Sequence, residues 1–158
     1  MTQLPFMNRI FLLLLMCILS CTPAAQIQNG WENEYLGTKE GTLFYPDNYA
    51  NYWMYSFRPT TSMAYKVSGQ LPQARYMSLN LYLHDRRQSV GSMIDNEIAT
   101  ENGAYEVWFV PPGHEQVGKN CLVFDPEKGR HSIFLRYYDP QGDDYGSVPL
   151  PEITAIDL

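Results

Sequence analysis

The sequence predicts an all-β fold, a single jelly-roll-like β-sandwich. After the N-terminal region, short runs rich in Tyr, Phe, Val, Ile and Trp alternate with the turn residues Gly, Pro, Asn and Asp. No segment of this part repeats its apolar residues with the 3.6-residue period of a helix over a sustained length. Many short strands separated by frequent turns are typical of sandwiches and jelly rolls.

The chain is long enough for one domain with a sizeable core. It has 158 residues, of which 45% are hydrophobic and 14% are aromatic, so a disordered chain is not expected. The formal net charge is −6, and the largest basic cluster is the pair Arg86-Arg87. Nucleic-acid binding depends on Lys and Arg side chains that neutralise phosphates, so we expect no nucleic-acid partner.

The N-terminus is typical of a bacterial lipoprotein signal peptide. Arg9 precedes the apolar run Ile10–Leu19, which is shorter than the about 20 residues that span a bilayer. The sequence ILSC, ending at Cys21, resembles a lipobox, in which the cysteine is lipidated and becomes the first mature residue. We therefore expect a signal peptide over 1–20, a tether over 21–30 and a β-sandwich domain over 31–158.

Two alternatives concern the same segment. Cleavage near Ala24-Ala25 would leave Cys21 unmodified, but Pro23 fits such a site poorly. Either Met1 or Met7 serves as the start, because the first six residues add nothing to the signal.

The residue after the lipidated cysteine and the number of cysteines bear on location. Thr22 follows Cys21 in place of Asp, which in a Gram-negative cell is typical of cargo for the outer membrane. We therefore expect a bacterial envelope protein that contacts the membrane through its N-terminal lipid. Cys17 leaves with the signal, so Cys121 is the remaining thiol and no internal disulfide is expected. Its apolar neighbours predict a small buried side chain.

Three segments alternate apolar and polar residues with the period of a strand: Arg75–Leu83, Ala104–Val110 and His131–Tyr138. Alternate side chains of a strand point to opposite faces of its sheet. The predicted inward set is Met77, Leu79, Leu81, Leu83, Tyr105, Val107, Phe109, Ile133, Leu135 and Tyr137.

If these strands share a sheet, its second face carries a mainly aromatic and polar set: Tyr76, Asn80, Tyr82, Glu106, Trp108, Phe134, Arg136 and Tyr138. Aromatic rings stack on sugars or peptides, and polar neighbours fix the ligand's orientation by hydrogen bonds. The alternative is structural, because tyrosines also form cross-strand pairs without a ligand. Arg75 likewise either pairs with Asp95 to pin strands or clamps an anionic ligand.

Several short motifs occur in an order that resembles a known bacterial family. They are PDNYANYW from Pro46, GQLPQARYMSLNLY from Gly69, IDNEI from Ile94, the strand Gly103–Val110, KNCL from Lys119, His131–Pro140 and VPLPEI from Val148. This set resembles the domain of unknown function numbered 1214, which is often found beside the one numbered 1254. The resemblance covers Asp47 to Ile153 and implies a jelly-roll-like β fold without an agreed activity. Cys121 stands where related sequences tend to have Trp, so a pocket lined by that Trp is not carried over.

No established motif for metal binding or nucleophilic catalysis is present. His84, His114 and His131 lie at strand ends or in turns and lack H-x-H or H-x-x-x-H spacing. The acidic stretch from Asp139 to Gly146 lacks the terminal Glu of an EF-hand loop and is typical of a turn. We therefore expect no metal and no cofactor.

These observations favour a lipid-anchored envelope protein that binds or assembles without catalysis, with a carbohydrate or another envelope protein as its ligand. One alternative is a glycan-acting hydrolase with Asp95 and Glu106 as its carboxylate pair. A second alternative is a structural subunit that assembles with other copies of itself. The sequence leaves the oligomeric state open.

Overall fold

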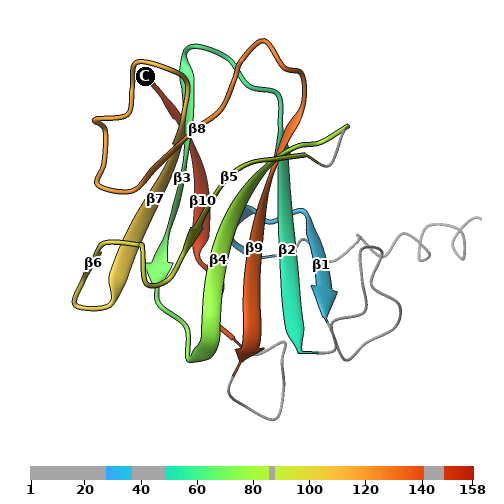
Figure 1. Ribbon diagram of the computed structural model, residues 1–158, viewed down its shortest axis with the longest axis vertical. Helices are drawn as coiled ribbons and strands as arrows, with labels where there is room; N and C mark the ends of the chain where they lie inside the picture. The colour runs from blue at the N-terminus through green and yellow to red at the C-terminus, as the bar shows by residue number, and fades with distance from the viewer. Residues whose placement is uncertain (1–27, 37–48, 86–87, 141–147) are drawn as a thin grey trace, which may run out of the picture.

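The computed structural model describes residues 28–36, 49–85, 88–140 and 148–158. The predicted signal peptide and Cys21 lie outside these ranges, as does most of the acidic stretch 139–146. The described residues form one 3₁₀ turn, η1, and ten strands (Figure 1). Their bounds are η1 Gln28–Gly30, β1 Asn33–Leu36, β2 Ala50–Phe57, β3 Met63–Gln70, β4 Ala74–Leu83, β5 Gln88–Ile94, β6 Thr100–Glu101, β7 Ala104–Val110, β8 Cys121–Val123, β9 His131–Pro140 and β10 Glu152–Asp157. Within the described ranges, no helix has the length and apolarity to cross a membrane.

The strands form two sheets that enclose one core (Figure 1). Sheet A has the order β1-β2-β9-β4-β5, and sheet B has the order β10-β3-β7-β6 with β8 added beside β7. All pairs are antiparallel except β7 with β8, which run parallel. The predicted all-β sandwich is confirmed, and the jelly-roll connectivity stays a prediction.

The core consists of the alternate side chains that the two sheets turn toward each other. All ten residues predicted to point inward are buried, which confirms the alternation. Leu79 on β4 lies opposite Leu135 on β9, and Val67 on β3 lies opposite Val107 on β7. Each fully buried Leu or Val contributes about 1.5–3 kcal/mol to stability, so this interior is the main stabilising feature of the sandwich.

The N-terminal turn packs against the last strand. The Trp31 indole Nε1 donates a hydrogen bond of 2.9 Å to the carbonyl oxygen of Pro151. Gly30 has a φ of +89°, and a Cβ there would lie 2.6 Å from Cγ2 of Ile153 on β10. The position therefore favours glycine for two reasons. The last three residues of the predicted tether, 28–30, thus belong to the folded structure.

Candidate functional site

Sheet A brings tyrosines and an arginine from three neighbouring strands together on its outer face. β9 lies between β2 and β4, so Tyr52 on β2 lies opposite Arg136 on β9, and Tyr76 on β4 lies opposite Tyr138 on β9. These four residues, called here the arginine–tyrosine surface, point away from the core because their chain neighbours point inward. The predicted association of Tyr76, Arg136 and Tyr138 is confirmed, and Tyr52 is an addition that sequence reasoning missed.

The Arg136 guanidinium lies among the three tyrosine rings. Its Cζ atom is 5.2 Å from the ring centroid of Tyr52, 5.5 Å from that of Tyr76 and 5.4 Å from that of Tyr138. The rings of Tyr76 and Tyr138 stack with centroids 5.1 Å apart and an interplanar angle of 12°. Arg75 adds a second guanidinium, 5.6 Å from the Tyr138 centroid. Cations within about 6 Å of an aromatic centroid are attracted to the ring face, so these contacts fix a firm, partly exposed platform.

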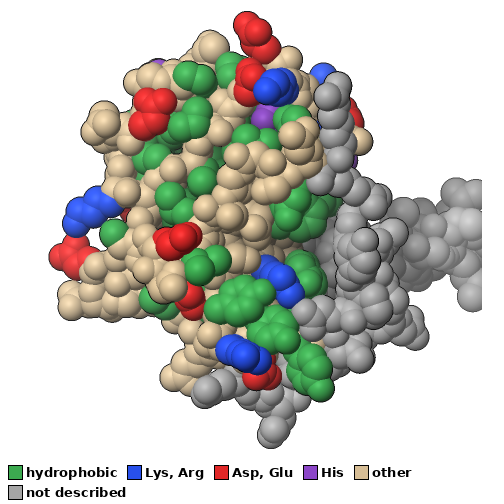
Figure 2. Space-filling view, in the orientation of Figure 1, with side chains coloured by type: hydrophobic (Ala, Val, Ile, Leu, Met, Phe, Trp, Pro, Cys, Tyr) green, Lys and Arg blue, Asp and Glu red, His purple; other side chains and the backbone are tan. Residues whose placement is uncertain are grey.

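The rest of the predicted face continues along β4 and β9. Tyr82 and Phe134 meet edge to face with centroids 5.2 Å apart. The Asn80 amide Nδ2 donates a hydrogen bond of 3.0 Å to Oγ of Ser78 on the same strand. In Figure 2, hydrophobic and Lys or Arg side chains lie side by side over the lower ends of β4 and β9. Aromatic and polar groups are therefore both offered to solvent on this face.

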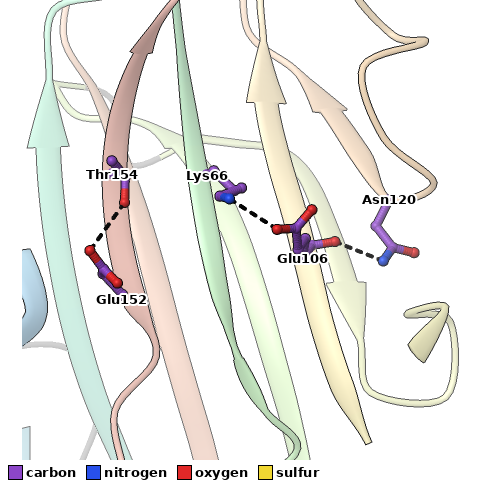
Figure 3. Close-up of polar contacts among 5 residues, drawn as sticks. All are labelled: Lys66, Glu106, Asn120, Glu152 and Thr154. Carbon is purple, nitrogen blue, oxygen red and sulfur yellow. Dashed lines mark hydrogen bonds and ion pairs between the residues drawn. The ribbon is translucent and has the colours of Figure 1, made fainter. Parts of the chain in front are cut away.

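Glu106 and Trp108 belong to the other sheet, which corrects the predicted face. β7 pairs with β3 in sheet B, and both residues project from the outer side of that sheet. Glu106 forms an ion pair of 2.9 Å with Lys66 (Figure 3). The Lys66 Nζ lies 5.5 Å from the Trp108 centroid. Alternation assigns a residue to one face of its own strand, but pairing between distant strands decides which sheet the strand joins.

The loop after β7 covers Trp108. A Cβ on Gly118 would lie 2.5 Å from Cδ1 of the indole, so the glycine backbone rests directly on the ring. The indole Nε1 is buried and has no hydrogen-bond partner among the described residues. Cys121, at the end of this loop, is half-buried, and burial raises the pKa of its thiol. Both observations disfavour this side of the molecule as a ligand platform or as a source of a reactive thiolate.

The predicted ion pair between Arg75 and Asp95 is not formed within the described chain. The Asp95 carboxylate instead accepts hydrogen bonds from two backbone N–H groups, that of Met77 at 3.1 Å and that of Asn96 at 2.9 Å. It therefore pins the turn after β5 to β4, as a short acidic side chain commonly does. Arg75 turns to the Tyr138 ring.

A histidine–serine contact escaped sequence reasoning because its partners are far apart in the chain. Nδ1 of His84 lies 2.6 Å from Oγ of Ser132, which lies 3.2 Å from Oγ of Ser56. Ser132 is fully buried, so no substrate reaches its hydroxyl. The contact joins the ends of β2, β4 and β9. Within the described ranges, no group of three or more His, Cys, Asp or Glu side chains is placed to hold a metal ion.

A depression of about 290 Å³ lies near the start of β9 and is a weaker candidate. It is lined by Leu83, Gln88, Ser89, Val90, Asp125, Lys128 and His131. The Lys128 ammonium and the Asp125 carboxylate pair with each other at 3.4 Å. His131 is fully buried and bonds through Nδ1 to the carbonyl of Gly129. The charged pair and the histidine of this depression are therefore engaged within the protein, which leaves the exposed side chains of Gln88 and Ser89 as its polar groups for a ligand.

Comparison with known proteins adds support for the fold alone. No protein-family model matches the chain, and no curated protein sequence matches it. The VPA0106 protein from Vibrio parahaemolyticus has a similar structure, with a TM-score of 0.55 and 22% identity over 73% of this chain and 33% of its own. An uncharacterized protein from Burkholderia cenocepacia has a TM-score of 0.51 and 14% identity over 99% of this chain and 44% of its own. This chain therefore spans less than half the length of either protein.

Proposed function

We propose that the protein is a lipid-anchored component of the bacterial cell envelope that binds a carbohydrate, without catalysis, on the arginine–tyrosine surface. The observation that carries the proposal is the position of Arg136, 5.2 to 5.5 Å from the centroids of three tyrosine rings on the outer face of sheet A. A sugar ring presents an apolar face that stacks on tyrosine, while its hydroxyl groups bond to neighbouring amides and guanidinium groups.

The size of the surface favours a sugar over a protein partner. A stable protein interface buries about 800 Å² on each side, which is far more than four to six side chains provide. The three ring contacts of Arg136 hold the platform in place before a ligand arrives. Such preorganisation reduces the entropy lost on binding. Another envelope protein is the competing ligand.

The membrane anchor is the second part of the proposal. It is supported by the apolar run before Cys21 and the lipobox-like sequence that ends there. Two or more acyl chains hold a protein on a bilayer more firmly than one. Membership of the 1214 family and jelly-roll connectivity belong to the same proposal, and the order of the sequence motifs supports them.

The anchor is tested by Cys21→Ser. We expect the wild-type chain, expressed in a Gram-negative cell, to incorporate radiolabelled palmitate and to sediment with the outer membrane. The variant is expected to lose the label and to accumulate as an uncleaved precursor. Cys121→Ser is the matched control, because it removes the other thiol of the mature chain. Retained labelling in Cys21→Ser would refute the anchor.

The binding surface is tested with the full chain in detergent micelles on an array of purified envelope glycans. Tyr76→Ala and Tyr138→Ala each remove one half of the stacked pair, and we expect each to weaken glycan binding about fivefold or more, since stacking on an aromatic ring contributes about 1 kcal/mol or more. Thr154→Ala, on the outer side of sheet B, is the control. Unchanged binding in both tyrosine variants would remove the surface from consideration, and capture of a defined envelope protein in place of glycans would favour the competing ligand.

The hydrolase alternative gains no support from the placement of its carboxylates. Asp95 accepts two backbone hydrogen bonds beside sheet A, whereas Glu106 is paired with Lys66 on sheet B. A glycosidase needs two carboxyl groups that flank one substrate bond. Unchanged envelope glycans after prolonged incubation would exclude this activity.

A further inference from the structure

The arginine–tyrosine surface is bordered by a guanidinium that lacks a carboxylate partner among the described residues. Resting on the proposed function, we infer that the ligand is an acidic polysaccharide that contains uronic acids, and that Arg75 binds its carboxylate. Arg75 is exposed, and its Cζ lies 5.6 Å from the ring centroid of Tyr138. It forms no ion pair within the described chain.

Asp95 and Asp139 are candidates for neutralising Arg75, but neither forms an ion pair with it. Asp95, the predicted partner, accepts hydrogen bonds from backbone N–H groups. Asp139 directly follows Tyr138 but forms no ion pair with Arg75. Arg75 and Arg136 thus place two guanidinium groups beside Tyr138 in a chain whose formal net charge is −6.

A guanidinium that lies over an aromatic ring keeps its N–H groups for a second partner. The ring contacts the flat side of the guanidinium, while its five N–H donors lie in the plane. A carboxylate can accept two parallel hydrogen bonds from this edge. The contact with Tyr138 thus holds the Arg75 guanidinium beside the rings without satisfying its N–H donors.

The combination of an aromatic stack and an adjacent guanidinium matches the two chemical features of a uronic acid. In the inferred complex, the apolar face of the sugar ring packs against the exposed part of the stacked pair Tyr76 and Tyr138, and the carboxylate on C5 of the same ring binds Arg75. A neutral sugar uses only the first feature. A small anion such as inorganic phosphate uses only the second feature.

Oligouronates and their methyl esters provide matched probes, because esterification removes the charge and keeps the ring. We would measure binding by titration calorimetry with the full chain in micelles, using oligomers of galacturonic, mannuronic and glucuronic acid. We expect at least one acidic oligomer to bind about tenfold more tightly than its ester, as one charge-assisted hydrogen-bond pair would give.

The variants separate the charge from the stack. Arg75→Gln is expected to remove the preference for the acid over the ester and to leave the affinity for the ester unchanged. Arg75→Lys is expected to keep only part of this preference. Tyr138→Ala is expected to lower the affinity for both the acid and the ester. Arg130→Gln, which removes an exposed charge beside the opposite end of β9, is expected to change neither affinity.

Two results would overturn the inference in distinguishable ways. Equal affinity for acid and ester, unchanged by Arg75→Gln, would leave the carbohydrate surface in place but refute the uronic acid. Failure of every acid and ester to bind would refute the uronic acid, and only the absence of binding on the glycan array as well would contradict the proposed carbohydrate surface.

Discussion

Asn120 joins two segments of sheet B that the sequence does not place together. Its Nδ2 donates hydrogen bonds to the carbonyl oxygens of Ala99 at 3.0 Å and Glu106 at 2.8 Å, and its Oδ1 accepts one from the Ala99 N–H at 2.8 Å. The bond to Glu106 is drawn in Figure 3. Only 4% of the Asn120 surface is exposed, so its amide is held between the two segments.

Asn120→Ala is therefore expected to lower the free energy of unfolding by about 2–4 kcal/mol, because it removes three part-buried hydrogen bonds that contribute about 0.5–1.5 kcal/mol each. Urea denaturation followed by circular dichroism measures this change. Asn96→Ala is the control, since the side chain of Asn96 is exposed. A loss in Asn120→Ala no larger than in the control would show that the three bonds contribute little.

The backbone of Gly118 lies close to the indole ring of Trp108. An added Cβ would lie 2.5 Å from Cδ1 and 2.7 Å from Nε1 of Trp108. We expect Gly118→Ala to lift the loop from the indole, with a loss of about 1–3 kcal/mol in stability and greater quenching of tryptophan fluorescence by acrylamide. Gln116→Ala, in the exposed part of the loop, should change neither quantity. Wild-type stability and quenching in Gly118→Ala would mean that the loop adapts freely.

At the scale of elements, β7 and β9 each contribute a buried tyrosine to the core. Burial raises the pKa of Tyr105 on β7 and of Tyr137 on β9 above the ordinary value of 10.0. Tyr137 also donates a hydrogen bond of 3.2 Å to the carbonyl of Pro149. Both hydroxyl groups must stay protonated in the folded state, because a buried phenolate is poorly solvated.

This burial predicts alkaline sensitivity. The unfolded chain ionises its tyrosines near pH 10 while the folded state keeps these two protonated, so their contribution is complete below pH 10 and falls as the pH rises above it. Each such tyrosine is expected to lower the free energy of unfolding by about 1.4 kcal/mol per pH unit in that range. Urea titrations between pH 8 and 11.5 would show a shallower fall in Tyr105→Phe and an unchanged fall in Tyr49→Phe, since Tyr49 is exposed. An equal pH dependence of the free energy of unfolding in Tyr105→Phe and wild type would contradict a buried, protonated Tyr105.

The sequence predicted the faces of individual strands because alternation is local. Met77, Leu79 and Leu81 point inward as expected, and Tyr76 therefore points outward with Tyr138. Strand pairing depends on contacts between distant segments, which no local pattern reveals. For this reason the local pattern places Glu106 and Trp108 on the wrong sheet, and it reveals neither the contribution of Tyr52 nor the bonds of Asn120.

At the scale of the whole molecule, the outer faces of the two sheets differ in chemistry. On sheet B, Lys66 is neutralised by Glu106 and lies over a tryptophan that a loop covers. On sheet A, Arg75 and Arg136 lie against tyrosine rings that remain partly exposed. The sandwich thus offers a ligand one cationic and aromatic face among its described residues.

The central claim, that a carbohydrate binds to this face of sheet A, is tested most directly by a nuclear magnetic resonance titration. The labelled full chain in micelles would be titrated with the oligouronate of highest affinity. We expect the side-chain signals of Tyr76, Arg136 and Tyr138 to shift in a saturable way, while the Trp108 indole signal stays in place. Shifts at Trp108 or at the depression lined by Lys128, with the signals of Tyr76 and Tyr138 unmoved, would contradict the account.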